Sequence, residues 1–148
     1  MKQVYVGMAA LIEKDGKYLI LKRSAERDFE PNSWEIVTGR LEADEAPNVG
    51  IVREVKEETS LDVEVIMPID TGFFYRGSKE FPMVFISYFC RFTKGEIKLD
   101  WEHTEYKWIT LDEAIENKDL KHFTNMFANL RELKKFTPDD FKYQFSNV

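Results

Sequence analysis

The sequence is poor in cysteine, histidine, proline and glycine. Its 148 residues include one cysteine (Cys90), two histidines, five prolines and seven glycines. A single cysteine excludes an internal disulfide and is typical of the reducing cytoplasm, where we expect the protein to work. No linker rich in glycine, proline or serine and no internal repeat divides the chain. We therefore expect one domain over residues 1–148, long enough to bury a hydrophobic core.

Positive charge is also scarce. The chain has 21 lysines and arginines against 27 aspartates and glutamates, a formal net charge of −6 at pH 7. This balance argues against a protein that coats a nucleic acid polymer. No apolar run approaches the length of a membrane span, and the amino terminus lacks the layout of a signal peptide. We therefore expect a small-molecule partner, and an acidic enzyme can bind a phosphorylated one when a metal ion supplies the positive charge.

Hydrophobic and aromatic residues are plentiful, at 43% and 14% of the chain. Much of this content falls in apolar runs that end at turn signals, which is the pattern of β-strands. Asp15 and Gly16, for example, form a hairpin turn between two such runs. The longest run, 81–92, predicts a strand at the sheet centre. The expected strands cover residues 4–12, 17–23, 34–38, 63–66, 73–75, 81–92 and 106–109, with a break at 70–72.

Two helices are expected in the last third of the chain. Thr110 and Glu113 form a capping box that opens a short helix. From His122 to Lys135 the apolar residues recur at helical spacing, which predicts an amphipathic helix packed on the core. The tail from Phe136 onward carries further aromatic residues, and it either packs on the body or meets a partner.

The stretch from Gly39 to Leu61 organises the rest of the chain. Pro47 suits the first turn of a helix, and Asp44 or Glu45 stands near its expected cap. Gly50 inside that helix destabilises it by about 1 kcal/mol relative to alanine. We therefore expect a helix that lies tight against a sheet at this glycine.

Three carboxylates share one face of this helix, because Glu54, Glu57 and Glu58 are three and four residues apart. Two unit charges 4 Å apart repel by about 4 kcal/mol at an effective dielectric constant of 20. Either one carboxyl group takes a proton or a cation lies among them. Oxygen ligands without nearby histidine or cysteine favour magnesium or manganese over zinc. The alternative interpretation is an acidic face exposed to solvent.

These carboxylates belong to a longer pattern. The stretch resembles the Nudix box, G-x5-E-x7-R-E-U-x-E-E-x-G-U, in which U is a bulky aliphatic residue. Six fixed positions arise by chance at a given start on the order of once in ten million, since each residue type makes up roughly 5–7% of proteins. Ser60 departs from the glycine that usually ends this helix in a left-handed conformation. The matching residues are Gly39, Glu45, Arg53, Glu54, Val55, Glu57, Glu58 and Leu61.

The resemblance to the Nudix family of hydrolases, with its MutT-like members, implies a fold and a reaction. The fold is α+β, an α/β/α sandwich with a mixed β-sheet. The reaction is hydrolysis of a nucleoside diphosphate linked to another moiety, by water that attacks a phosphorus of the pyrophosphate linkage. The implied cofactor is Mg²⁺, with Mn²⁺ as the other candidate. Its implied ligands are the Gly39 carbonyl oxygen and the carboxylates of Glu54, Glu57 and Glu58.

Supporting roles follow from the same resemblance. Arg53 orients the metal-binding glutamates by ion pairing and counts, with Glu54 and Glu57, among the expected catalytic residues. Glu45 braces the loop before the helix. The departure at Ser60 concerns the turn and not the ligands, so we expect activity to survive it.

A further acidic participant is expected near residues 101–109, which resemble the acidic loop and strand that precede the last helices of many Nudix enzymes. Glu102 or Glu105 supplies the general base or another metal ligand, with a solvated loop carboxylate as the alternative for each. We prefer Glu102, because a loop residue can approach the attacking water. His103 is interpreted as a surface or hydrogen-bonded histidine rather than a ligand.

Three residues are candidates for substrate binding. Lys22 and Arg23 end a strand and pair readily with phosphate oxygens, with ordinary basic residues at a strand end as the alternative. Tyr75, or Phe74 beside it, is a candidate for contact with a flat base.

The identity of the substrate stays open at this point. Short motifs resemble the branch that acts on dihydroneopterin triphosphate and deoxynucleoside triphosphates, and dinucleoside polyphosphates and nucleotide sugars are the alternatives. A non-catalytic Nudix domain that binds nucleotides as a sensor is the alternative function. The intact Glu54, Glu57 and Glu58 argue against it, because a pure binder does not need them all. Monomer and homodimer are both compatible with the sequence.

Overall fold

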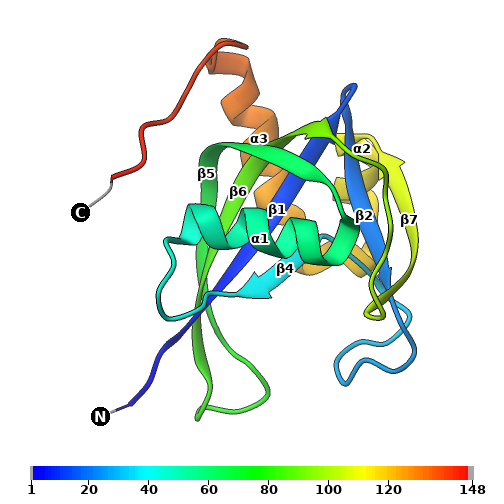
Figure 1. Ribbon diagram of the computed structural model, residues 1–148, viewed down its shortest axis with the longest axis vertical. Coiled ribbons are helices and arrows are strands. Elements are labelled where there is room, and N and C mark those ends of the chain that lie inside the picture. Colours follow the sequence, from blue (N-terminus) through cyan, green and yellow to red (C-terminus); the bar gives the residue numbers. More distant parts are fainter. Residues whose placement is uncertain (1, 147–148) are drawn as a thin grey trace.

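A mixed sheet of seven strands forms the centre of the structure, with helices on both of its faces (Figure 1). The computed structural model describes residues 2–146. Within that range no helix is long and apolar enough to cross a membrane. In chain order the elements are β1 (Tyr5–Lys14), β2 (Lys17–Arg23), β3 (Trp34–Glu35), β4 (Val37–Arg40), α1 (Pro47–Thr59), β5 (Asp62–Tyr75), β6 (Pro82–Lys94), β7 (His103–Ile109), α2 (Leu111–Glu116), the 3₁₀-helix η1 (Lys118–Phe123) and α3 (Thr124–Phe136).

The central strand of the sheet is β1. It pairs with β2 and β4 in antiparallel ladders and with β6 in a parallel one, which makes the sheet mixed. In addition, β2 pairs with β3 and β7, and β6 pairs with β5, all antiparallel. The prediction that residues 81–92 form the sheet centre was therefore wrong, because β6 lies between β1 and β5.

Side chains alternate between the two faces along β1, so the sheet buries a separate core on each face. Leu11 points to the face covered by α2 and α3, where it belongs to the same core as Phe127. Met8 points to the opposite face and shares a core with Ile51 and Val55 of α1. The expected α+β sandwich is confirmed, with α1 on one side of the sheet and the C-terminal helices on the other (Figure 1).

The predicted central helix begins at Pro47, as expected. Its N-cap is Ala46, which makes no capping hydrogen bond, so neither Asp44 nor Glu45 caps the helix. Gly50 is buried, and a Cβ atom there would lie 2.7 Å from a carboxylate oxygen of Glu45 and 3.0 Å from Cε of Met8 in β1. The close approach that we inferred at this glycine is present, and α1 therefore lies close enough to the sheet to fix the position of its glutamates.

Ser60 ends α1 in the left-handed conformation, at φ 64° and ψ 8°. Its N–H donates to the carbonyl of Lys56 at 3.0 Å, which is the bond that usually closes a helix. The departure from the glycine of the Nudix box therefore leaves the end of the helix in place.

Three segments differ from the predicted elements. Residues 62–75 form one strand. Its register against β6 shifts at several points between residues 62 and 70, but the pairing continues through 70–72, where we expected a break. Residues 34–40 form two short strands instead of one, since β3 pairs with β2 and β4 pairs with β1. The predicted helix from His122 begins at Thr124, after a turn of 3₁₀-helix.

The C-terminal part of the described chain packs on the body. The capping box of Thr110 and Glu113 is confirmed, with both of its hydrogen bonds present. After α3, the Tyr143 N–H donates to the carbonyl of Ile66 at 3.4 Å, and Phe145 lies in the core on the α1 side. Phe145 thus packs on the body, whereas Phe141 and Tyr143 are 38% and 44% exposed, so both alternatives for the tail stay open, and residues 147–148 lie outside the described residues.

Candidate active site

The last turn of α1 buries a carboxylate. Glu58 is 5% exposed, and its Oε2 has no hydrogen-bond partner within the described chain. Burial raises the pKa of Glu58 well above its ordinary range, and the charges of Glu35, Glu102 and Glu54 raise it further. Leaving a buried polar group unsatisfied destabilises a fold by about 1–3 kcal/mol, and by more for a charged one. Glu58 therefore needs either a proton or a cation.

The backbone of β4 approaches α1 next to this carboxylate. A Cβ atom on Gly39 would lie 2.1 Å from Cδ of Glu54, so any side chain at this position would displace the glutamate. Burial raises the pKa of Glu54, while the hydrogen bond and charge of Arg53 lower it, and burial prevails. The glycine therefore allows a backbone strand and a partly buried carboxylate to lie side by side.

Arg53 gathers several carboxylates around one guanidinium. It donates to the two oxygens of Glu45 at 2.6 and 3.0 Å. Further bonds reach Glu54 at 3.0 Å and Glu57 at 3.2 Å. Hydrogen bonds from Arg53, and then from the Glu42 N–H, hold the pKa of Glu45 at about 2. Glu45 thus ties the loop before α1 to the helix, and its supporting role in the site stays a prediction.

The three glutamates of α1 do not converge on one point. The side chain of Glu57 is 56% exposed and pairs with Arg53, whereas Glu58 is buried. Among the described residues, the group with one ligand atom each within 4.8 Å of one another is Asp100, Glu102 and His103. Both ring nitrogens of this histidine already lie against carboxylates. The atoms near Glu58 that could still bind a metal ion are therefore carboxylate oxygens, and oxygen ligands fit a hard divalent cation.

A buried ion-pair network lies close to Glu58, and sequence reasoning missed it. Glu35 in β3 accepts a 2.6 Å hydrogen bond from Arg23 and lies 2.7 Å from Nε2 of His103. Burial alone raises the pKa of Glu35, but the hydrogen bonds and charges of His103 and Arg23 outweigh it and lower the pKa. Nδ1 of His103 lies 3.2 Å from Asp100. His103 is hydrogen-bonded, as expected, but it is 4% exposed and so not at the surface.

The predicted substrate residues lie in different surroundings. Arg23 is buried against Glu35 and also donates to the carbonyl of Phe29 at 2.7 Å. Lys22 pairs with Glu105 at 3.0 Å. Tyr75 is 49% exposed near the tip of the β5–β6 hairpin, which extends beyond the rest of the sheet (Figure 1). The structure does not bring these three side chains together on one surface, and their contacts with substrate stay predictions.

Glu102 and Glu105 also differ in surroundings. Because β7 begins at His103, Glu105 is fixed on a strand, whereas Glu102 lies in the loop before it. The carbonyl of Glu102 accepts the N–H of Ser24 at 2.8 Å, and its carboxylate lies 3.1 Å from Arg27. The charge of Glu102 is among those that raise the pKa of Glu54 and Glu58, so it faces the carboxylates of α1.

Arginines from four segments surround the same region. Burial lowers the pKa of Arg76, and the charges of Arg40, Arg23 and Arg27 lower it further, so these three arginines lie in the neighbourhood of Arg76. Sequence reasoning found only Arg23. No spacing in the sequence connects the others, because two strand ends, a loop and a hairpin turn supply one arginine each. Carboxylates with an adjacent cluster of arginines suit a metal-bound phosphate chain.

Comparison with known proteins identifies the family to which this site belongs. The model of the NUDIX domain family matches residues 1–130. A MutT-like protein of Streptomyces ambofaciens is 32% identical over 106 residues, which are 72% of this chain and 63% of that protein. The nucleoside triphosphatase NudI of Escherichia coli is 28% identical over 133 residues, 84% of this chain and 90% of the relative.

Solved structures agree with the sequence comparison. The crystal structure of the MutT protein from Methanosarcina mazei Go1 superposes with a TM-score of 0.80 at 25% identity, over 90% of this chain and 97% of that one. The shared fold, the spacing of the Nudix box and a family match that covers most of the chain point to one conclusion. This chain belongs to the Nudix hydrolase family.

Proposed function

We propose that this protein is a metal-dependent pyrophosphohydrolase that acts on a nucleoside triphosphate or a similar triphosphate, such as a pterin triphosphate. The observation that carries the proposal is the buried Glu58, whose Oε2 faces further carboxylates and has no hydrogen-bond partner among residues 2–146. A nucleotide-binding surface alone has no need for such an arrangement. The name of the relative NudI, a nucleoside triphosphatase, supports the substrate class.

The site fits Mg²⁺, with Mn²⁺ as the alternative, because the available donors are oxygens. Gly39, through its carbonyl, and the carboxylates of Glu54, Glu57 and Glu58 would hold the metal. When bound, the ion polarises the phosphoryl oxygens and lowers the pKa of a bound water. The buried position of Glu58 makes it the ligand whose charge depends most on the ion.

The remaining residues prepare and neutralise the site. Arg53 keeps Glu54 and Glu57 oriented through its hydrogen bonds, and Glu45 holds Arg53 in turn. Glu102 lies in the loop that faces these carboxylates, where it accepts the proton of the attacking water. The network of Glu35 and His103 keeps that loop close, because His103 is the next residue along the chain.

The basic residues would bind the phosphate chain. Arg27 and Arg76 approach the region of Glu102 and Arg23 from two loops, and their guanidinium groups match phosphate oxygens. In this proposal Lys22 and Arg23 bind phosphate oxygens, as we predicted, and Arg23 does so while it stays paired with Glu35. Tyr75 remains the candidate for contact with the base.

The setting and partner follow from the same proposal. The substrate is a small molecule, and neither a nucleic acid polymer nor a membrane is involved. Cys90 is buried and free, which suits the reducing cytoplasm.

Hydrolysis of a substrate panel tests this function. The panel holds ribo- and deoxynucleoside triphosphates, dihydroneopterin triphosphate, a dinucleoside polyphosphate and a nucleotide sugar, each with and without Mg²⁺ or Mn²⁺. We expect metal-dependent release of pyrophosphate from a triphosphate, and water labelled with ¹⁸O identifies the phosphorus that is attacked. At limiting Mg²⁺ a Glu58→Gln variant should lower the activity about tenfold to a hundredfold, while Glu64→Gln, an exposed glutamate of β5, should keep it. Saturable nucleotide binding without turnover of any substrate would instead favour the sensor.

A further inference from the structure

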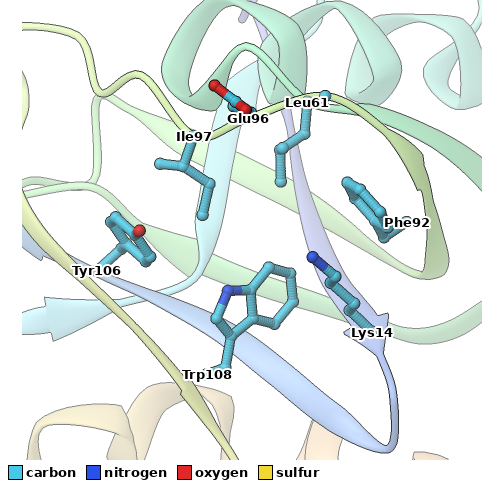
Figure 2. Close-up of a pocket in the computed structure, with 8 residues that line it drawn as sticks. Lys14, Leu61, Phe92, Glu96, Ile97, Tyr106 and Trp108 are labelled. Atoms are coloured by element: carbon cyan, nitrogen blue, oxygen red, sulfur yellow. The ribbon is translucent and has the colours of Figure 1, made fainter.

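A cavity of about 350 Å³ lies on the α1 side of the sheet and shares no lining residue with the candidate active site (Figure 2). Its walls come from the β1–β2 hairpin, the end of β6, the segment after it, and β7. The volume falls at the lower end of the range for small-molecule sites. The lining residues are Lys14, Leu61, Phe92, Gly95, Glu96, Ile97, Tyr106 and Trp108.

Aromatic rings and aliphatic side chains form the walls. Leu61 is buried and belongs to the core under α1, and Phe92, Ile97 and Trp108 pack against that core. This part of the cavity is therefore held by the fold. Tyr106 is 47% exposed, so the cavity opens to solvent on its side. A flat ring fits such walls, because ring faces contribute large contact areas with little loss of rotamer freedom.

The polar groups of the cavity are mainly donors. The ammonium of Lys14 lies 4.4 Å from the ring centroid of Phe92 and 5.9 Å from that of Trp108. Figure 2 shows this nitrogen pointing into the space between the two rings, with the carboxylate of Glu96 on the far side of the cavity. Within residues 2–146, no hydrogen bond or ion pair engages the Lys14 ammonium, the Trp108 indole N–H or the Tyr106 hydroxyl.

We propose that this cavity binds a small flat aromatic molecule that carries an anionic group. Its ring lies against Trp108 and the aliphatic wall of Ile97, and its anionic group meets the Lys14 ammonium. The aromatic rings beside Lys14 keep the cation in place without neutralising it, because a cation–π contact leaves the hydrogen-bond donors free. The three donors without a partner within residues 2–146 stand beside aromatic and aliphatic walls, and this arrangement favours an acceptor-rich anion with a flat ring over a neutral or cationic ligand.

The test is a titration of the full chain with 1-naphthoate, followed by the indole N–H signals in ¹H–¹⁵N correlation spectra. The chain has three tryptophans, and a Trp108→Phe variant assigns the signal of Trp108. We expect that signal to shift in a saturable way, with a dissociation constant on the order of 1 mM for a ligand of this size. The neutral 1-naphthamide should bind at least about tenfold more weakly, because it lacks the charge that Lys14 recognises.

Matched variants decide whether the named residues carry the binding. Lys14→Met should weaken naphthoate binding at least about tenfold, while Lys121→Met removes the same charge from an exposed position of η1, on the other face of the sheet, and should change nothing. Tyr106→Phe keeps the ring, removes one donor, and should weaken binding by about threefold. Equal affinity for the amide and the acid, equal affinity in the two lysine variants, or shifts confined to Trp34 and Trp101 would each overturn the proposal.

Discussion

Two glutamates of the same site differ in what neutralises them. Glu45 lies before α1, where both of its oxygens accept hydrogen bonds from Arg53 and its pKa falls to about 2. Glu58 lies in the last turn of α1, where burial and neighbouring carboxylates raise its pKa. Its Oε2 has no partner in the described chain. Arg53 therefore neutralises the charge of Glu45, whereas no cation of the described chain bonds to Oε2 of Glu58.

This difference separates two functions of one motif. The part around Arg53 supplies its own cation, so it folds into a defined geometry without any ligand. In the part around Glu58, Arg23 and Arg27 pair with Glu35 and Glu102, but Oε2 of Glu58 has no hydrogen-bond partner in the described chain, which destabilises the metal-free fold. We infer that the balanced part holds the helix and the loop in position, while the unbalanced part provides the attraction for a divalent ion.

The largest effect that we expect concerns Glu102, which faces the unbalanced part. Glu102→Gln should lower turnover by at least about a hundredfold with little change in apparent substrate affinity, because general bases contribute at least that much. Glu105→Gln should have a much smaller effect, because Glu105 is fixed on β7 by its ion pair with Lys22 of β2. Steady-state kinetics of both variants with saturating substrate check this. A Glu102→Gln enzyme at the wild-type rate, with Glu105→Gln impaired, would show that we chose the wrong residue.

A smaller loss is expected when the proposed ligands change. Glu57→Gln and Glu58→Gln each keep the size of the side chain and remove a charge, so turnover at limiting Mg²⁺ should fall about tenfold to a hundredfold. Without metal, Glu58→Gln should be at least as stable as the wild type, since one buried charge is removed. Kinetics together with urea unfolding of the metal-free proteins measure both effects. Full activity of both variants at limiting Mg²⁺ would contradict the assignment.

Sequence reasoning could reach the balanced part of the site because one continuous stretch encodes it. The residues from Gly39 to Glu58 form one continuous stretch, and within α1 the fixed spacing along the helix determines which side chains share a face. Part of the strand order could be predicted for the same reason, because the two strands of a hairpin are neighbours in the sequence. The position of β6 beside β1 was not, because a parallel pair depends on contacts between distant segments.

The network around Glu35 escaped prediction for the same physical reason. Glu35 looks like any polar residue in a short strand, and its partners Arg23 and His103 are far from it in the sequence or separated by a loop. Only the folded sheet places β2, β3 and β7 side by side. One signal of a buried Glu35 was present in the sequence, because this carboxylate comes directly before the apolar pair 36–37 in a segment that is otherwise apolar.

Metal binding should stabilise the fold by a moderate amount. A ligand that binds only the native state adds about 1.4 kcal/mol when its free concentration is tenfold above the dissociation constant. We expect this gain with Mg²⁺ or Mn²⁺, and we expect most of it to vanish in Glu58→Gln. Thermal unfolding at several metal concentrations measures it, with Ca²⁺-free buffer and a chelator as the zero point. A melting temperature that ignores millimolar Mg²⁺, with or without nucleotide, would favour the solvent-exposed acidic face that the sequence left as an alternative.

The smallest expected effects are opposite slopes of stability against pH for the two glutamates. The folded pKa of Glu58 is raised, so its favourable contribution is complete below the ordinary value of 4.5 and is lost as pH rises through the folded value. The folded pKa of Glu45 is lowered to about 2, so its contribution is present above 4.5 and is lost as pH falls towards 2. For Glu45 the effect should stay below about 1 kcal/mol, because solvent screens this ion pair.

Urea unfolding of the metal-free protein between pH 3 and pH 8 separates the two contributions. Glu58→Gln should remove the loss of stability on the alkaline side of pH 4.5, and Glu45→Gln should remove part of the loss on the acidic side. Glu64→Gln, on the exposed face of β5, serves as the control with the same chemical change. If Glu58→Gln leaves the alkaline slope unchanged, then Glu58 is charged in the metal-free fold. The contrast between a balanced and an unbalanced carboxylate would then fail, because some cation of the chain must already neutralise Glu58.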